Sequence, residues 1–179
     1  MSQRPDSGTK QAQPVPLDYG SLCPYVAVRN AAAFLDFLRE AFGAIERGRV
    51  TLEDGTIGHA EVWIGNRVVQ MFDASPDWPD TPAFLSLYVE DCDAVHAQAL
   101  AAGATEVTAL FTNAWGDRMG RVRDPFGNIW WIQTHVEDVD EAEMIRRMSD
   151  AAYMEGTLKA QQTLDDELRH RGEDGKTPV

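Results

Sequence analysis

The chain has 179 residues and a formal net charge of −13 at pH 7. This length fits one domain of ordinary size with tails left over, and the negative charge argues against non-specific binding to nucleic acid or to an anionic membrane. We therefore predict no nucleic-acid partner and no membrane partner. The charge would attract a cationic ligand, although the maintenance of solubility explains it more simply.

Two cysteines, Cys23 and Cys92, are too few for a disulfide framework, and neither has a second Cys or a His at the spacing of a metal motif. Residues 1–16 lack the apolar core of a signal peptide, and no run of about 18 apolar residues follows them. These features predict a cytoplasmic protein. Residues 1–18 are rich in Ser, Gln and Pro, a composition typical of a flexible arm.

A first βαβββ module is predicted over residues 19–75. A strand at 24–28 leads to a helix that Asn30 caps at its start and Gly43 ends with a left-handed residue. The hydrophobic period then shortens to two, which predicts a three-stranded meander over 47–52, 56–64 and 67–72. Residues 73–82, with three prolines, form the crossover to the next module.

A second module with the same order of elements is predicted over residues 83–136. Its first strand covers 84–89, Asp91 caps a helix over 92–102, and Gly103 follows the helix. Three strands over 106–111, 120–123 and 129–135 complete the module. The chain thus repeats one βαβββ unit, and a repeat of this kind is expected to enclose a site between its copies.

A helical extension is predicted over residues 137–172, followed by a flexible tail at 173–179. Asp140 with Glu143 three residues later is typical of a helix start, and a second helical run extends from Tyr153 to about His170. The first part of the extension continues an apolar face, made by Met144, Ile145, Met148, Ala151 and Ala152. We expect this extension to pack on the domain or on a second subunit, and to take no part in chemistry.

Side chains alternate along a strand, so each strand is expected to turn its aliphatic set to the helix and the other set to the space between the modules. In the last strand, a shift of one residue in the hairpin register would turn Trp130, instead of Trp131, to the space between the modules. The predicted inward set is Cys23, Tyr25, Ala27, His59, Glu61, Trp63, Val68, Gln70, Phe72, Phe84, Ser86, Tyr88, Ile129, Trp131, Gln133 and His135.

Five short motifs carry a resemblance to a known family. They are Ala41-Phe42-Gly43-Ala44, Ile57-Gly58-His59-Ala60-Glu61, Leu87-Tyr88-Val89-Glu90-Asp91, Trp115-Gly116-Asp117-Arg118 and Arg123-Asp124-Pro125-Phe126-Gly127. With them, residues 22–135 resemble the vicinal oxygen chelate superfamily of glyoxalase I, bleomycin-resistance proteins, extradiol dioxygenases and fosfomycin-resistance enzymes, and most closely an uncharacterised glyoxalase-like branch. The resemblance implies an α+β fold in which the two modules, here residues 19–136, form a cupped, half-open mixed β-barrel. It also implies a homodimer.

The resemblance places the metal-ligand positions of this superfamily at Cys23, Gln70, Phe84 and Trp131. Metal-dependent members have His or Glu there, whereas phenyl and indole rings offer a cation no lone pair and Gln is a weak ligand. We therefore predict no metal and no other cofactor. The departure puts glyoxalase, dioxygenase and thiol-transfer activities in doubt, because in those families they depend on the metal.

The expected function is metal-free binding or sequestration of a small aromatic or hydrophobic molecule, a cationic one included, as the resemblance to bleomycin-resistance proteins implies. An aromatic-lined cavity suits such a ligand. Arg118, with Arg121 or Arg123, would either clamp a carboxylate or phosphate or pair with Asp117 and Asp124. The predicted ligand-binding residues are Tyr25, Trp63, Gln70, Phe72, Phe84, Tyr88, Arg118 and Trp131.

An alternative is a lyase, isomerase or dioxygenase of the same superfamily, with or without a divalent metal, and the sequence leaves open whether the protein is an enzyme. His59, Glu61 and His135 would then be the catalytic residues. A hydrogen-bonded structural pair is the simpler explanation of His59 and Glu61. A third possibility is a module that serves chiefly to dimerise. His96 is expected to be a surface group.

Overall fold

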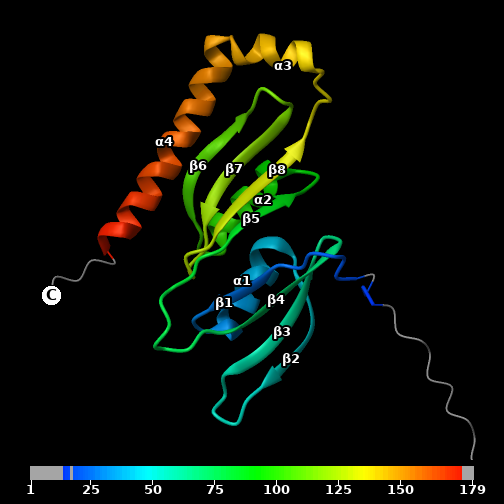
Figure 1. Ribbon diagram of the computed structural model, residues 1–179, viewed down its shortest axis with the longest axis vertical. Coiled ribbons are helices and arrows are strands. Elements are labelled where there is room, and N and C mark those ends of the chain that lie inside the picture. The colour runs from blue at the N-terminus through cyan, green and yellow to red at the C-terminus, as the bar shows by residue number, and fades with distance from the viewer. Residues whose placement is uncertain (1–13, 17, 175–179) are drawn as a thin grey trace, which may run out of the picture.

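The computed structural model describes residues 14–16 and 18–174, and shows two βαβββ modules followed by two helices (Figure 1). The first module has β1 (Tyr25–Val28), α1 (Ala31–Phe42), β2 (Ile45–Thr51), β3 (Ile57–Ile64) and β4 (Arg67–Asp73). The second has β5 (Phe84–Tyr88), α2 (Cys92–Ala101), β6 (Thr105–Thr112), β7 (Asp117–Arg123) and β8 (Ile129–His135). The predicted repeat and α+β class are confirmed.

The predicted helix caps are confirmed at both modules. Asn30 has φ 67° and its side chain accepts a hydrogen bond from the Ala33 amide, while Gly43 ends α1 at φ 63°. Asp91 accepts from the Ala94 amide at the start of α2. Each cap satisfies backbone groups that a helix end leaves unpaired, so residues of these types mark the helix limits locally.

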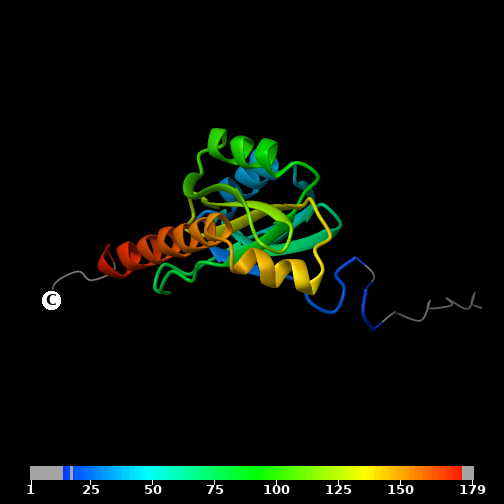
Figure 2. The same cartoon turned by 90° about the horizontal axis from the view of Figure 1, so that it is seen from above.

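Each module forms its own four-stranded sheet, in the orders β1-β4-β3-β2 and β5-β8-β7-β6. The first strand of each module pairs parallel with the last, and the other pairs are antiparallel. Helices α1 and α2 pack against each other on the same side of the two sheets (Figure 2). The core therefore lies between this helix pair and the sheets.

The predicted strand faces are confirmed by burial. Val26 and Val62 are 2% and 1% exposed and belong to the core beneath α1. Trp130 is 2% exposed, its ring lies 4.5 Å from that of Phe42, and it is therefore the tryptophan of β8 that faces the helices. No register slip has occurred, and Trp131 lies on the opposite face.

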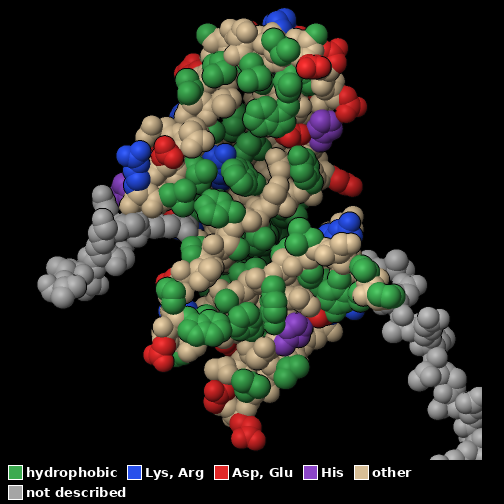
Figure 3. Space-filling view, viewed as in Figure 1, with side chains coloured by type: hydrophobic (Ala, Val, Ile, Leu, Met, Phe, Trp, Pro, Cys, Tyr) green, Lys and Arg blue, Asp and Glu red, His purple; other side chains and the backbone are tan. Residues whose placement is uncertain are grey.

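The faces of the two sheets turned away from α1 and α2 point to the same side of the molecule. Hydrophobic side chains gather over both sheets on this side (Figure 3), and Tyr25, Phe84 and Tyr88 are about half exposed there. The two modules touch instead through α1 and α2, and through Phe126 packed on Phe34 and Phe37. Within one chain, the space predicted between the modules is thus an open face, which we call the aromatic face.

The predicted C-terminal helices are present as α3 (Glu141–Met148) and α4 (Ala151–Asp174), and Asp140 caps α3 through the Glu143 amide. The predicted apolar face of α3 does not pack on the domain, because Ile145 and Met148 are 57% and 53% exposed within one chain. The alternative, packing on a second subunit, stays a prediction. The side chain that α3 buries is Arg147, which bonds to Glu137 and Glu143.

Helix α4 packs along β6 on the side of the second sheet opposite α2 (Figure 2). Gly156 lies against the Phe111 ring, where an added Cβ would come within 3.1 Å of that ring. The Thr163 and Thr108 hydroxyls are 2.8 Å apart. Packing of the extension on the domain is confirmed for α4.

The surface position predicted for His96 is wrong. Its side chain is 3% exposed and its ring lies against Gly120 of β7, because α2 turns it toward the sheet. Most of the predicted arm (1–18) and tail (173–179) lies outside the described residues. None of the described helices is both long and apolar enough to cross a membrane. The cytoplasmic location stays a prediction.

Candidate functional site

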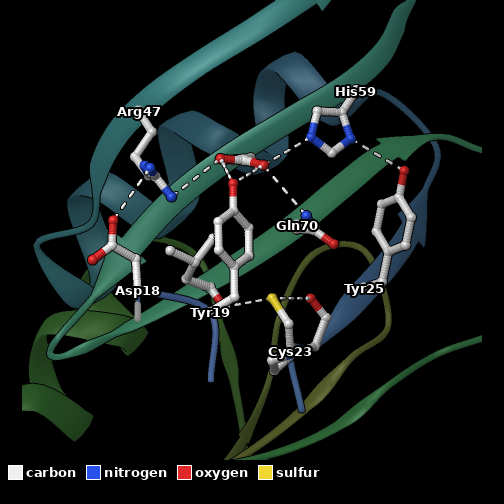
Figure 4. Close-up of polar contacts among 10 residues, drawn as sticks. Asp18, Tyr19, Cys23, Tyr25, Arg47, His59 and Gln70 are labelled. Carbon is white, nitrogen blue, oxygen red and sulfur yellow. Dashed lines mark hydrogen bonds and ion pairs between the residues drawn. The ribbon is translucent and has the colours of Figure 1, made fainter. Parts of the chain in front are cut away.

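A polar cluster on the first sheet is centred on the carboxylate of Glu61. Figure 4 labels the side chains that surround this carboxylate, Tyr19, Arg47, His59 and Gln70. The Tyr19 hydroxyl lies 2.7 and 2.8 Å from its two oxygens, and the Gln70 amide donates to it at 3.3 Å. The Arg47 guanidinium lies 3.4 Å from the same carboxylate and 3.5 Å from Asp18. Three side chains from different segments, Tyr19, Arg47 and Gln70, thus converge on one acid.

His59 links this cluster to the edge strand β1. Its Nε2 lies 3.1 Å from Glu61 and its Nδ1 lies 3.1 Å from the Tyr25 hydroxyl. The strand register explains the grouping, because Gln70 of β4 stands opposite both Tyr25 of β1 and Glu61 of β3. The structure therefore brings together the predicted residues His59, Glu61, Gln70 and Tyr25.

The electrostatics of this cluster hold Glu61 ionised. Burial by itself raises its pKa, but hydrogen bonds from Tyr19, His59 and Gln70 and the charge of Arg47 bring the pKa below its ordinary value. The hydrogen bond to Glu61 is the main cause that raises the pKa of Tyr19. An ionised carboxylate with all these donors is a poor proton acceptor, so the contacts favour a structural pair.

Aromatic rings border the polar cluster. Tyr25 and Phe72 meet edge to face with centroids 5.2 Å apart, and Phe72 meets Trp78 of the crossover at 6.1 Å. The Arg47 guanidinium lies 5.3 Å from the Trp63 ring. The first sheet thus offers rings that can contact a flat ligand beside fixed polar groups.

The second sheet carries the remaining predicted rings. Phe84 and Trp131 lie 6.3 Å apart, and the Arg121 guanidinium stacks 4.5 Å from the Trp131 centroid. Tyr88 is 61% exposed and its hydroxyl donates to Asp117. These residues share the aromatic face with the first-sheet cluster, although each sheet holds its own set.

Two predicted residues lie apart from the Glu61 cluster, although one of them, His135, shares Asp117 with Tyr88. His135 lies on the second sheet, where its ring nitrogens are 3.0 Å from Asp138 and 2.8 Å from Asp117, and these carboxylates raise its pKa. Arg118 is turned toward α2 and bonds to Asp93 through two contacts of 2.5 and 2.6 Å. The set His59, Glu61 and His135 is thus divided between two separate networks.

The donors at the four family metal positions do not fit a divalent ion. The Cys23 thiol lies 3.2 Å from the Val68 carbonyl oxygen and burial raises its pKa, so it is not a ready thiolate. Gln70 donates to Glu61, and the Phe84 and Trp131 rings have no lone pair for a metal. No three His, Cys, Asp or Glu side chains of the described residues are grouped as metal ligands.

Sequence reasoning missed Tyr19 and Arg47. Tyr19 precedes the first strand, where no alternation could assign it a face, and its partner lies 42 residues away in the chain. Arg47 follows the start of β2, whose residues are all exposed and show no clear pattern. The N-terminal segment crosses the sheet and brings Tyr19 to Glu61 (Figure 4), whereas the pairing of β2 with β3 places Arg47 there.

Comparisons with known proteins agree with this fold. A family model described as the Glyoxalase/Bleomycin resistance protein/Dioxygenase superfamily matches residues 21–132. The chain is 39% identical over 140 residues to the uncharacterized protein Mb0911c of Mycobacterium bovis, and the alignment covers 72% of this chain and 92% of that relative.

Two solved structures illustrate the similarity. TioX from Micromonospora sp. ML1 is 28% identical and has a TM-score of 0.55 over 63% of this chain and 95% of TioX. The fosfomycin resistance protein FosX from Listeria monocytogenes has a TM-score of 0.52 over 70% of this chain and 97% of its own, at 12% identity. The second likeness concerns the fold alone.

Proposed function

Because the chain belongs to the glyoxalase/bleomycin resistance protein/dioxygenase superfamily, we propose that it binds or sequesters a small aromatic or hydrophobic molecule without a metal. The observation that carries this proposal is the aromatic face, where Tyr25, Phe84 and Tyr88 are about half exposed on the two sheets that also carry Trp63 and Trp131. Exposed apolar surface of this kind is typical of binding sites, and a few fixed polar groups then orient the ligand.

The contacts favour binding over catalysis by the predicted residues. Glu61 is ionised and surrounded by donors, and His135 belongs to a different network on the other sheet. The same donors leave Glu61 little capacity to pair with a cationic ligand. A preference for cationic ligands would therefore rest on the negative net charge of the protein, which acts at long range and raises the rate at which a cation associates.

The first test is elemental analysis and native mass spectrometry of protein purified without added metal or chelator. We expect no stoichiometric metal and, where the ligand survives purification, an added organic mass. Stoichiometric zinc, nickel, manganese or iron would overturn the metal-free proposal and would make His59 and Glu61, which are in contact, the first ligands to mutate.

Removal of a tryptophan ring from the aromatic face should weaken ligand binding. With 2-naphthol as a neutral probe, we expect Trp63→Ala and Trp131→Ala each to reduce affinity in calorimetry, because each lost ring contact removes about 0.5 to 1.5 kcal/mol beyond the buried area. Trp115→Ala is the control, since it also removes an accessible tryptophan ring, 47% exposed, but one in the loop between β6 and β7. Unchanged affinity in both Trp63→Ala and Trp131→Ala would contradict the proposed site.

We also propose that the protein is a homodimer in which a second copy covers the aromatic face. A two-fold axis would set the first sheet of one copy against the second sheet of its partner, and the half-exposed Tyr88 lies where such a contact would bury it. Light scattering on the full chain should give twice the mass of one chain, and Tyr88→Glu should shift it toward the monomer.

The control for the dimer is Leu158→Glu on the free side of α4, where Leu158 is 62% exposed. This variant should leave the mass unchanged. A monomeric wild-type chain would refute the dimer, whereas dissociation by Leu158→Glu with no effect of Tyr88→Glu would place the interface on the C-terminal helices.

A further inference from the structure

Strand β7 carries three arginines, and one of them lacks a carboxylate. Arg118 bonds to Asp93, and Arg123 bonds to Glu167 at 2.9 Å. Arg121, between them, has no carboxylate partner among the described residues. It is also the most buried of the three, with 8% of its surface exposed.

The contacts of Arg121 use only part of its donor set. Its Nη1 donates to the Ala160 carbonyl at 2.7 Å and to the Thr108 hydroxyl at 3.2 Å, and its guanidinium stacks on Trp131. Its buried Nε has no hydrogen-bond partner. Guanidinium has five N–H donors, so the edge formed by Nε and Nη2 has no acceptor from the described residues.

A buried cation without a counter-ion is unfavourable, and a buried donor without an acceptor adds to the cost. Burial lowers the pKa of Arg121 to about 10, so the side chain still carries its charge at neutral pH. Neutral acceptors and one ring compensate this charge only in part. The site is therefore complementary to an anion that the chain itself does not provide.

The position of Arg121 in the sheet shows from which side an anion can come. One row of paired residues crosses the second sheet: Ser86 of β5, Trp131 of β8, Arg121 of β7 and Thr108 of β6. Helix α4 covers the Thr108 end of this row through Ala160 and Thr163. The Ser86 end is exposed, and Trp131 lies between it and Arg121, so an anion from that side would reach the guanidinium past the Trp131 ring, next to the half-exposed ring of Phe84.

We propose that Arg121 and Trp131 form an anion-recognition site on the second sheet, and that its ligand is an aromatic carboxylate. The carboxylate would accept a hydrogen bond from Nη2, and a second one from Nε once the side chains that cover this buried atom move aside, because the fork of the two groups matches its two oxygens. The ring of the ligand would lie toward Phe84 and Trp131. This inference rests on the proposed aromatic-ligand function and adds to it the charge of the ligand.

The test compares three naphthalene compounds by calorimetry on the full chain: 2-naphthoate, 2-naphthamide and 2-naphthylmethylammonium. They share the ring and differ in charge. We expect the carboxylate to bind at least about tenfold more tightly than the amide, because hydrogen bonds to a charged group are the stronger ones. Arg121→Gln should reduce the affinity for the carboxylate to that for the amide, and Arg121→Lys should restore it only in part.

Because Arg121 also holds α4, a second variant separates charge recognition from helix anchoring. Glu167→Gln removes the ion pair between α4 and Arg123 without touching Arg121, and it should leave carboxylate affinity unchanged. An equal loss in both variants would overturn the anion site and assign Arg121 a purely structural role.

The outcomes distinguish this inference from the proposed function. Equal affinity for the three compounds, lost on Trp131→Ala, would refute the anion site and leave aromatic binding intact. Failure of all three to bind would count against both. A carboxylate preference that disappears in Arg121→Gln and persists in Glu167→Gln would support both.

Discussion

Replacement of Gly116 by alanine is expected to destabilise the protein by about 4 kcal/mol, a loss that marks a severe backbone conflict. Gly116 has φ 92°, and a Cβ at this position would lie 2.0 Å from the Glu137 carbonyl oxygen. The neighbouring atom is backbone and cannot rotate away. In addition, the Gly116 carbonyl accepts hydrogen bonds from the Val136 and Glu137 amides, so a shift of the turn would break both.

Urea unfolding measures this loss, and Gly55→Ala is its matched control. Gly55 has a similar φ of 87°, but nothing lies within 4 Å of its added Cβ. The control should lose only the left-handed backbone cost, about 1 to 2 kcal/mol. Similar losses in the two variants would show that the contact with Glu137 is unimportant.

Replacement of Asp124 by alanine is expected to cost about 3 to 5 kcal/mol, because it breaks a buried hydrogen-bond network. Asp124 is 2% exposed. One carboxylate oxygen accepts from the Phe126 and Asn128 amides, and the other accepts from the side chains of Asn128 and Trp130. Alanine would leave four donors without their acceptor in the turn between β7 and β8.

Two further variants test this explanation by the same unfolding measurement. Asp124→Asn keeps one acceptor oxygen but turns an amide NH2 group toward two of the donors. Its loss of unfolding free energy should therefore lie between zero and that of Asp124→Ala. Asp80→Ala removes an exposed carboxylate that bonds to Arg29, and exposed ion pairs contribute about 1 kcal/mol or less. A loss in Asp124→Ala no larger than in Asp80→Ala would contradict the network.

Both residues belong to motifs that carry the family resemblance. Gly116 stands in Trp115-Gly116-Asp117-Arg118 and Asp124 stands in Arg123-Asp124-Pro125-Phe126-Gly127. The structure gives each a role in a turn: one permits backbone contact with the segment after β8, and the other closes the hairpin that positions Trp130 and Trp131. These motifs thus specify the fold of the second module more directly than they specify a ligand.

The sequence by itself determined the repeat, the helix limits and the face that each strand turns to the helices. These features depend on local rules: a cap satisfies backbone groups within three or four residues, and strand side chains alternate with a period of two. Asn30, Asp91 and Asp140 cap their helices as predicted. Val26, Val62 and Trp130 are buried on the predicted side.

Only the tertiary structure decided which groups meet. Alternation assigns a residue to a face but does not name its partner, so Arg118 and Arg121 could not be told apart until the sheet, α2 and α4 were placed around them. The meeting of Tyr19 with Glu61, the burial of His96 and the separation of His135 from His59 likewise depend on long-range packing. The open aromatic face arises for the same reason: α1 and α2 pack together, and this contact leaves the rings of both sheets uncovered.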